Sequence, residues 1–315
     1  MRIVFMGSPQ FAVLPLEYLV QNGYEVTAVY TQPDRPGGRG RQTIISPVKK
    51  AAQALGLMVV QPEKLRKPEV IAALADCHPE AIVVAAYGQI LPPAVLEIPK
   101  HGCLNIHPSL LPRHRGASPV TATILAGDEF AGVSIMLMEA GLDTGPVLAR
   151  AQIPVSGRDT TGTLTEKLSL IAAHLVQDVL LHWVRGELKP QPQNEAAATY
   201  SKPVAKEEGE IKWDLPGDVI WRRVRAFQPW PGAFTTWRGK RLEIIQGVPL
   251  YRSDGPPPGT VIDLRQVNAE AVFGIATGDG VLGVGGVQLA DKKAMSAADF
   301  LRGQPDIIGA RLPSD

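Results

Sequence analysis

Apolar runs of strand length alternate with amphipathic segments of helical length through roughly the first 140 residues of the chain. Strands are predicted for the ranges 3–5, 26–30, 58–60, 82–85 and 104–106,. Helices are predicted between them for the ranges 11–22, 47–57 and 68–76,. Near-continuous apolar strands separated by helices are typical of a parallel sheet that helices cover on both faces. The predicted fold class is therefore α/β with a doubly wound, mostly parallel sheet, whose functional side chains lie at the carboxyl ends of its strands.

The hydrophobic pattern changes twice beyond this region. Two alternating runs, 133–138 and 147–154, predict a hairpin-like pair, and the segment 160–185 predicts a long helix,. The periodicity then disappears into a polar, proline-rich stretch, beyond which short alternating segments predict a small β-barrel or sandwich with a helix at 218–227,. These changes divide the chain into three parts: an α/β domain over 1–188, a linker over 189–204 and a second domain over 205–315,.

Composition narrows the class of protein. The chain has 32 basic and 31 acidic residues, a net charge of +1, which excludes a protein that coats nucleic acid through global positive charge but leaves local patches open,. Its two cysteines, Cys77 and Cys103, form no C-x-x-C pair, so we expect a reducing compartment and no disulfide scaffold,. No two histidines have H-E-x-x-H spacing, so we expect no catalytic metal,. Because the longest apolar run has only strand length, we expect a soluble, cytoplasmic protein,.

The most informative polar cluster is at the predicted strand 104–106. Asn105 and His107 are two positions apart, so they project from the same side of the strand's end and can address one substrate atom,. Asp143 lies in a glycine-flanked turn at another sheet edge,. Taken singly, each residue has a structural explanation: Asn105 as a turn cap, His107 as a buried structural histidine and Asp143 as a turn residue.

Together these three side chains supply an amide donor, a titratable imidazole and a carboxylate, a set suited to acyl transfer through a tetrahedral intermediate. No serine or cysteine has nucleophile-elbow spacing, so direct transfer is favoured over a covalent enzyme intermediate,. A dinucleotide-dependent reaction is disfavoured, because the first βα turn has only Gly7 where G-x-G-x-x-G is required and has Pro9 in the second slot,.

Local positive charge gathers in one loop and in the second domain. The Gly- and Pro-rich segment 32–41 carries Arg35, Arg39 and Arg41, which can meet phosphates and base edges,. A solvated surface loop is the equal alternative for this segment. In the second domain, basic residues beside tryptophans suggest contact with single-stranded or backbone-level nucleic acid. These are Arg222, Arg223, Arg225, Arg238, Lys240 and Arg241, beside Trp221, Trp230 and Trp237.

With these motifs the chain resembles the methionyl-tRNA formyltransferase family. The similar stretches include residues 7–9, 32–36, 86–88, 105–116, 142–145 and 225–232. The N-x-H, S-L-L-P and L-D-T-G set is shared by folate-dependent formyltransferases generally, whereas the loop at 32–41 and the second domain point to the tRNA enzymes. The resemblance implies a formyltransferase-type, Rossmann-like catalytic domain followed by a C-terminal OB-like barrel.

The resemblance also implies a reaction: transfer of a formyl group from 10-formyltetrahydrofolate to the α-amino group of methionine on initiator tRNA. Asn105, His107 and Asp143 would be the catalytic residues, with Asp143 beside His107 and raising its pKa. The expected folate contacts are Tyr87, Gly88, Ser109, Leu110, Leu111 and Pro112. The expected tRNA contacts are Arg35, Arg39, Arg41, Arg222, Arg223 and Arg225. No metal and no membrane would take part, and we expect a monomer.

Two alternatives stay open. A formyltransferase of the same superfamily could use the same three residues on a nucleotide sugar or a ribonucleotide amine, although the basic loop and the second domain argue against it. A non-catalytic RNA-binding protein would use the two basic regions and keep the α/β domain as a scaffold. That second alternative leaves the co-occurrence of Asn105, His107 and Asp143 unexplained.

Overall fold

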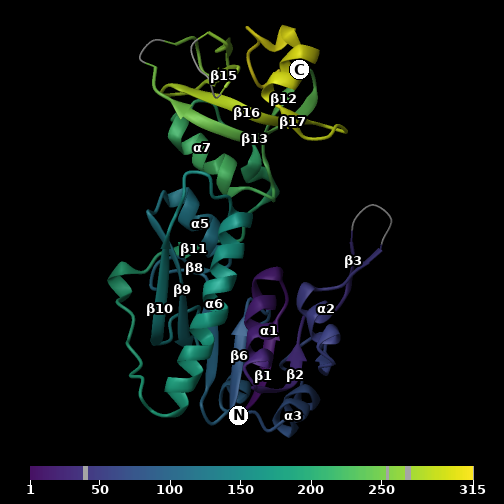
Figure 1. Cartoon of the computed structure of the whole chain (residues 1–315), viewed down its shortest axis with the longest axis vertical. Coiled ribbons are helices and arrows are strands. Elements are labelled where there is room, and N and C mark those ends of the chain that lie inside the picture. The colour runs from purple at the N-terminus through teal and green to yellow at the C-terminus, as the bar shows by residue number, and fades with distance from the viewer. Residues whose placement is uncertain (38–41, 253–254, 267–270, 315) are drawn as a thin grey trace. The chain divides into compact units, whose positions relative to one another are not determined.

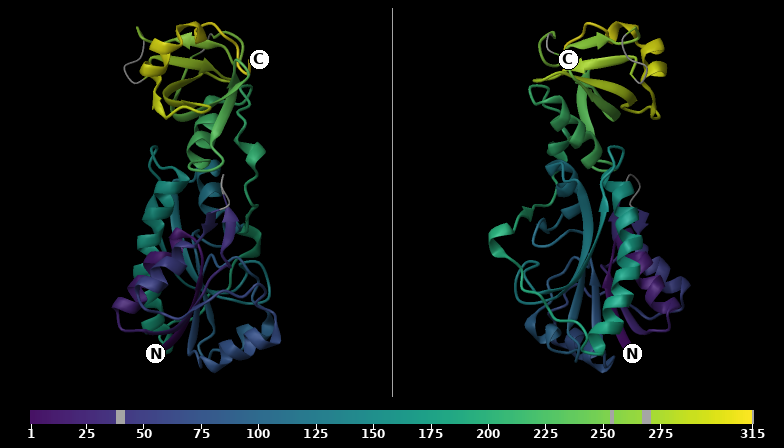
Figure 2. Two further views of the ribbon diagram at one scale, coloured as in Figure 1. Left: turned by 90° about the vertical axis from the view of Figure 1, so that its right-hand side faces the viewer. Right: turned by 60° about the vertical axis from the view of Figure 1, so that its left-hand side comes forward.

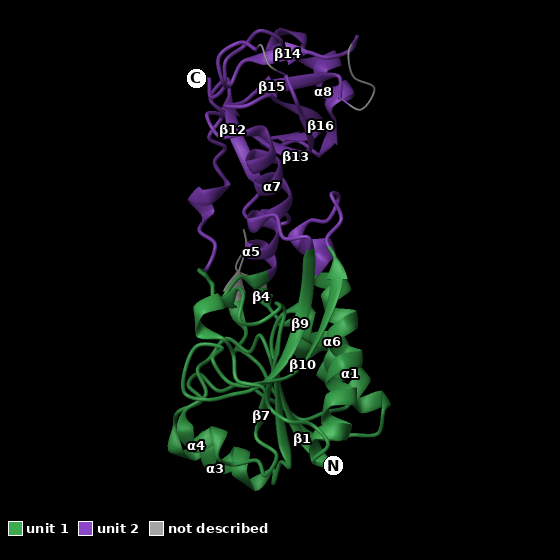
Figure 3. Ribbon diagram, turned by 90° about the vertical axis from the view of Figure 1, so that its left-hand side faces the viewer, with its two compact units in different colours: residues 1–119, 130–154, 165–202 green, residues 120–129, 155–164, 203–315 purple. Residues whose placement is uncertain are grey.

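The computed structural model describes residues 1–37, 42–252, 255–266 and 271–314 of the chain. These residues form two compact units (Figure 3). The first comprises residues 1–119, 130–154 and 165–202, and the second comprises residues 120–129, 155–164 and 203–315. Each unit has a hydrophobic core of its own.

Within the described part of the first unit, the centre is a seven-stranded sheet (Figure 1). Its strands are β1 (Arg2–Gly7), β2 (Glu25–Tyr30), β5 (Val59–Val60), β6 (Ala81–Ala85), β7 (Cys103–His107), β9 (Phe130–Leu137) and β10 (Val147–Pro154). Their order in the sheet is β10-β9-β7-β6-β1-β2-β5. The strands from β7 to β5 in this order are parallel, whereas β9 is antiparallel to both β7 and β10. The predicted mostly parallel sheet is therefore confirmed.

Helices cover both faces of this sheet, which explains its near-continuous apolar strands. Figure 3 shows α1 (Val13–Gln21) and α6 (Thr161–Val184) on one side and α3 (Pro68–Asp76) and α4 (Pro93–Leu96) on the other. The rings of Tyr18 in α1 and His174 in α6 meet edge-on, 4.6 Å apart at their centroids. The helix α2 (Pro47–Ala54) begins where the Ser46 hydroxyl accepts a hydrogen bond from the Lys49 amide,. Between the covering helices, residues 3–6 of β1 are fully buried.

The second unit is built on an antiparallel half-barrel (Figure 2). In its described residues the strands are β12 (Ala233–Trp237), β13 (Lys240–Leu250), β14 (Val261–Asp263), β15 (Phe273–Ala276), β16 (Val281–Leu289) and β17 (Met295–Ser296). They follow the order β12-β13-β16-β15-β14, with β17 beside β16. The helices α7 (Gly217–Ala226) and α8 (Ala297–Gly303) contribute to the same core, in which Trp213, Trp237 and Phe273 are buried. The predicted β-rich second domain is confirmed.

Short elements complete the chain. The hairpin of β3 (Arg35–Gly37) and β4 (Gln42–Ile44) carries the basic loop, and β8 (Arg115–Gly116) pairs in parallel with β11 (Tyr200–Ser201). The others are η1 (Gln10–Ala12), α5 (Pro119–Ala126), η2 (Glu195–Ala197), η3 (Lys206–Gly209) and η4 (Pro305–Ile307).

The polar stretch 189–204 has regular contacts along much of its length. It contains η2 and β11, and residues up to 202 belong to the first compact unit. The division of the chain at 188/189 and 204/205 stays a prediction. Among the helices that the structure describes, none has the length and apolar character needed to cross a bilayer.

Candidate active site

Three neighbouring strands bring their carboxyl ends to one edge of the first unit's sheet. From β1 the chain passes to β2 and β5 on one side, and it then crosses to β6 on the other side of β1. The order of the strands therefore reverses between β1 and β6, and their carboxyl ends form a topological switch point,. Gly7 ends β1, residues 86–88 follow β6, and Asn105 and His107 lie at the end of the adjacent β7. Open α/β sheets bind their ligands at such an edge.

Asn105, His107 and Asp143 meet at this edge. The Nδ2 amide of Asn105 donates a hydrogen bond to Asp143 Oδ1 at 3.3 Å, and His107 Nδ1 lies 3.7 Å from Asp143 Oδ2. Asn105 and His107 are 8% and 4% exposed, and the Asp143 side chain is 14% exposed. The structure thus brings an amide, an imidazole and a carboxylate, taken from two separate segments, within reach of one small group.

Asp143 reaches this position through a tight turn between β9 and β10. Its φ is +54°, in the left-handed region that aspartate tolerates better than most residues,. A Cβ at Gly145 would lie 1.8 Å from Leu137 O, so this place in the turn requires glycine,. The Gly116 amide donates to Asp143 Oδ2 at 2.8 Å, which holds the carboxylate from a third segment.

The ionisation of His107 differs from the sequence-based expectation. Burial lowers the pKa of His107 below its ordinary value of 6.5, and this outweighs the Asp143 charge and the hydrogen bond to His114 O, which both raise it,. The predicted rise in this pKa is therefore wrong, because residue spacing indicates the carboxylate but not the desolvation of the ring. The Nε2–H group donates to His114 O at 3.0 Å, so Nδ1 of the neutral ring carries the lone pair on the side of Asp143,.

We expect His107 to titrate below pH 6.5 in an NMR titration of the folded protein. Replacing Asp143 by asparagine should lower the pKa of His107 further, since the carboxylate stabilises the imidazolium,. Glu139→Gln, which neutralises an exposed acid close to the same turn, is the matched control. A His107 pKa above 6.5 would contradict the dominance of burial, and a rise of this pKa in Asp143→Asn would contradict the stabilisation of the imidazolium by the carboxylate,.

The segment 109–112, which is expected to contact folate, forms a turn after β7 that side-chain hydrogen bonds hold in place. Ser109 is buried, and its hydroxyl donates to Arg113 O at 2.6 Å. The Ser134 hydroxyl joins two points of the turn, since it donates to Ser109 O at 2.7 Å and accepts from the Leu111 amide at 3.1 Å. Leu111 is buried as well, whereas the side chains of Leu110 and Pro112 are half-buried.

Tyr87 and Gly88, also expected to contact folate, follow β6 at the switch point. The Tyr87 ring is 2% exposed within the core, and this burial raises its pKa to about 12,. Its carbonyl oxygen accepts hydrogen bonds from Ser8 Oγ at 3.1 Å and from Gln32 Nε2 at 3.0 Å. Gly88 has a φ of +86°, which favours glycine and lets the backbone turn outward from the strand,. The Tyr87 ring is therefore not available to a ligand, whereas Gly88 is exposed.

The basic loop is anchored at its first residues. The Asp34 carboxylate forms an ion pair with Lys49 Nζ and accepts a hydrogen bond from Gln61 Nε2 at 2.8 Å. The hydrogen bond to Lys49 is the main reason why the pKa of Asp34 is lowered,. Arg35 follows as an exposed residue, whereas Arg39 and Arg41 lie outside the described residues.

Two of the arginines expected to contact tRNA, Arg222 and Arg223, are half-buried on α7. Arg222 Nη2 donates to Asp218 Oδ2 at 2.9 Å, one helical turn earlier. Arg223 Nη2 donates to Glu208 O at 2.5 Å, and its guanidinium lies 5.0 Å from the centroid of the Phe227 ring. These are contacts within the second unit, and the role of both residues in tRNA binding stays a prediction.

Arg225 is the third arginine of α7 that is expected to contact tRNA. It is buried, with its guanidinium 3.9 Å from the centroid of the Trp221 ring. Its Nη1 lies 3.2 Å from both Ser156 O and Asp159 O. We expect Arg225→Ala to lower the free energy of unfolding by about 2 kcal/mol, because the carbonyls of Ser156 and of buried Asp159 lose a charged donor and the Trp221 ring loses its cation,. Urea unfolding followed by tryptophan fluorescence measures this, with half-buried Arg223→Ala as the comparison. Unchanged stability with a several-fold rise in the Kd for tRNA would establish instead the nucleic-acid role expected from the sequence.

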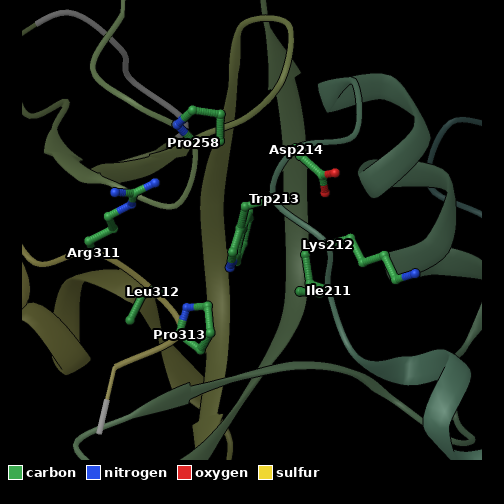
Figure 4. A pocket seen from close by; sticks show the side chains of 8 residues that line it. All are labelled: Ile211, Lys212, Trp213, Asp214, Pro258, Arg311, Leu312 and Pro313. Atoms are coloured by element: carbon green, nitrogen blue, oxygen red, sulfur yellow. The ribbon is translucent and has the colours of Figure 1, made fainter.

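A hollow of about 470 Å³ lies in the second unit (Figure 4). In the view of Figure 4, Arg311 and Lys212 extend on opposite sides of Trp213. The remaining lining residues are Ile211, Asp214, Pro258, Leu312 and Pro313. None of the residues predicted to bind folate or tRNA lines this hollow, and it contains none of the three catalytic candidates.

Sequence reasoning missed one polar side chain at the Asp143 turn. Gln193 Nε2 donates to Asp143 O at 2.8 Å and to Gly145 O at 2.7 Å, although it lies in the stretch predicted to be a linker. Gln193 lies in a polar, proline-rich segment, 48 to 50 residues from its partners, and nothing in the neighbouring sequence indicates that it contacts the Asp143 turn. Two pairings bring this segment back to the site: that of β8 with β11, and the antiparallel bridge between Gln191 and Val147.

Comparison with known protein families agrees with this arrangement. Residues 1–180 match the family model described as formyl transferase, and residues 203–305 match the one described as formyl transferase, C-terminal domain. The chain is therefore a formyltransferase with a C-terminal domain. Over 312 residues the chain is 51% identical to a methionyl-tRNA formyltransferase of Dehalococcoides mccartyi, and the match covers 99% of this chain and 98% of that relative. The chain belongs to the methionyl-tRNA formyltransferase family.

Two solved structures share the fold at low sequence identity. The sugar 3N-formyl transferase WlaRD, solved in the presence of dTDP and 5-N-formyl-THF, has a TM-score of 0.65 at 17% identity and covers 93% of this chain and 99% of its own. HypX from Aquifex aeolicus in complex with tetrahydrofolic acid has a TM-score of 0.63 at 20% identity and covers 96% of this chain. The chain spans about half (47%) of the length of HypX. These likenesses confirm the fold.

Proposed function

We propose that this enzyme transfers the formyl group of 10-formyltetrahydrofolate to the free α-amino group of methionyl-initiator tRNA, giving N-formylmethionyl-tRNA for translation initiation. The observation that carries the proposal is the identity of 51%, over almost the whole of both chains, to a protein named methionyl-tRNA formyltransferase. A folate donor is supported by the two related folds solved with a reduced folate. We place the reaction in the cytoplasm, where charged initiator tRNA is consumed.

The reaction joins a neutral amine to a formyl carbon. The amine lone pair attacks that carbon, the π electrons of the carbonyl group move onto its oxygen, and the bond from carbon to N10 breaks when the double bond re-forms. One proton leaves the amine nitrogen and one proton is taken up by N10, so atoms and charge balance. The protein therefore has two tasks, which are to stabilise the developing oxyanion and to carry one proton.

Asn105 is suited to the first task. Its amide nitrogen has two hydrogens, and Asp143 Oδ1 accepts one of them at 3.3 Å,. We assign the other hydrogen to the formyl oxygen, where negative charge grows during attack. Since the side chain is oriented by Asp143 and almost fully buried, this donor acts in a low-dielectric site without reorganisation,. The gain is larger in the transition state than in the ground state, which is the requirement for a rise in kcat.

His107 and Asp143 are suited to the second task. Because burial lowers the pKa of His107, the ring is neutral at pH 7 and its Nδ1 lone pair can take the proton that the amine releases,. The imidazolium that forms lies 3.7 Å from the Asp143 carboxylate, which stabilises it until the proton passes to N10,. This assignment makes His107 a proton carrier.

We propose that folate lies against residues 87–88 and 109–112, where Gly88 is exposed and the side chains of Leu110 and Pro112 are half-buried. For tRNA we keep Arg35, Arg39 and Arg41 as phosphate contacts. A single chain supplies all three catalytic side chains, so the enzyme is proposed to act as a monomer, and the mechanism uses no metal ion.

The test is formylation in a purified system. The protein is incubated with 10-formyltetrahydrofolate and initiator tRNA carrying methionine, and the aminoacyl group is released and identified by mass spectrometry. Formylmethionine is expected, together with one equivalent of tetrahydrofolate, and uncharged tRNA serves as the control for donor hydrolysis. Formylation of an amino-sugar nucleotide with no reaction of methionyl-tRNA would establish the sugar alternative, and binding of tRNA without transfer would establish the non-catalytic one.

A further inference from the structure

Arg115 lies shortly after the turn 109–112, and its charged side chain is 0% exposed. Its guanidinium is bound by residues of the stretch predicted to be a linker. Nη1 and Nη2 donate to the two carboxylate oxygens of Glu195 at 2.9 and 2.7 Å, and Nη1 donates to the Tyr200 hydroxyl at 3.3 Å. Nε and Nη2 both donate to Gln193 Oε1, at 3.1 and 3.0 Å. We refer to Arg115, Gln193, Glu195 and Tyr200 as the Arg115 cluster.

Arg115 determines which way the Gln193 amide faces. A guanidinium has only donors, so the atom of Gln193 that meets Arg115 is the oxygen Oε1,. Nε2 then faces the opposite side, where its two hydrogens go to Asp143 O at 2.8 Å and Gly145 O at 2.7 Å. The whole hydrogen-bonding capacity of this amide is used to join Arg115 to the turn that carries Asp143.

The backbone of Arg115 adds a second link to the same turn. The next amide, that of Gly116, donates to Asp143 Oδ2 at 2.8 Å. Arg115 N in turn donates to Thr199 O at 2.8 Å, within the pairing of β8 and β11. Asp143 is therefore held at its main chain by Gln193 and at its carboxylate by Gly116. Its φ of +54° is a conformation that persists only when the surroundings over-determine it,.

We propose that Gln193, oriented by Arg115, is a positioning residue for the transfer reaction: it sets the Asp143 turn so that the carboxylate meets Asn105 and His107. The segment after α6 is then part of the catalytic site as well as a connection between domains. This inference rests on the proposed function of the three catalytic side chains. Gln193 itself touches the turn and Arg115, so it acts on the reaction through Asp143.

The variant Gln193→Glu keeps the acceptor function of the Gln193 side chain and removes its donor function. The carboxylate keeps its acceptors for Arg115, so the linker segment stays attached, but it has no hydrogen to donate to the two carbonyl oxygens of the turn,. We expect kcat for formylation to fall at least about tenfold, with KM for both substrates changed by less than about twofold, because positioning matters most in the transition state. In Gln193→Ala, which removes the same donors without adding charge, the pKa of His107 should fall further, since the carboxylate that raises it is displaced,.

The matched control is Gln191→Glu, the same substitution two positions earlier. Gln191 is exposed, and its two hydrogen bonds with Val147, both 2.9 Å, are made by its backbone. This variant should keep the wild-type kcat and the wild-type pKa of His107. Circular dichroism melts of both variants report on folding, and if Gln193→Glu does not fold, Gln193→Ala removes the same donors without adding charge.

The inference is overturned if the Gln193 variants match the Gln191 control in kcat, or if Gln193→Ala matches it in the pKa of His107. It is also overturned if kcat and the melting temperature fall while both KM values rise, because that combined result indicates a structural role. The NMR measurement on His107 needs no substrate. A wild-type enzyme that does not formylate methionyl-tRNA would therefore refute the proposed function. The His107 pKa in the Gln193 variants would still report on the position of Asp143.

Discussion

Replacing Asn105 by alanine is expected to lower kcat for formylation by about 10² to 10³-fold, which is the usual effect of removing one oxyanion donor. The Kd for methionyl-tRNA should change by less than about twofold, because this side chain acts on the reacting carbonyl group rather than on the bound substrates. Rapid-quench measurement of formyl transfer on the enzyme, together with filter binding of methionyl-tRNA, separates the two quantities. The expectation follows from one buried amide that Asp143 orients with its second hydrogen still available.

Glu139→Ala is a suitable control for this experiment, since it removes an exposed side chain close to the Asp143 turn. Its kcat should equal that of the wild type. If Asn105→Ala weakens tRNA binding as much as it slows transfer, Asn105 has a structural role, and the oxyanion must be stabilised by another group.

Neutralising the basic loop has the second-largest expected effect, and it acts on binding. With Arg35, Arg39 and Arg41 all changed to alanine, KM for methionyl-tRNA should rise about tenfold or more at physiological salt, with kcat nearly unchanged. The slope of log KM against log salt concentration should decrease by about 2 to 3, because each lost phosphate contact removes close to one released counterion. Steady-state kinetics at four or more salt concentrations measure this slope.

The chain offers a matched triple variant for the loop. Lys64, Arg66 and Lys67 are exposed residues of the connection between β5 and α3, so changing all three to alanine alters the net charge equally. This variant should keep the wild-type salt slope. Equal slopes in the wild type and the Arg35/Arg39/Arg41 variant would contradict phosphate contact and leave that loop as a solvated surface feature.

The parts of the site that depend on local periodicity could be predicted from the sequence. Asn105 and His107 are two residues apart at the end of an apolar strand, so their common direction follows from strand geometry,. The glycines around Asp143 indicate a tight turn, and the structure places that turn against the same strand. The alternation of strands and helices likewise predicts the order of layers in the first unit.

Other properties depend on burial and on pairing between distant segments, which the spacing of residues along the sequence does not indicate. The lowered pKa of His107 results from the protein that surrounds the ring, so an argument from the neighbouring carboxylate alone gives the wrong sign,. Tyr87 is adjacent to the switch point, yet its ring is directed into the core. Gln193 reaches Asp143 because its segment pairs with distant parts of the chain, β11 with β8 and Gln191 with Val147.

Selectivity between acceptors distinguishes formylation of methionyl-tRNA from formylation of an amino sugar. In one assay with 10-formyltetrahydrofolate, kcat/KM is measured for methionyl-initiator tRNA, for methionine methyl ester and for a dTDP-linked amino sugar. We expect a kcat/KM for methionyl-tRNA that exceeds both others by at least about a thousandfold, because remote contacts with the tRNA contribute to transition-state binding. A kcat/KM for the amino sugar equal to or above that for methionyl-tRNA would contradict the proposed function.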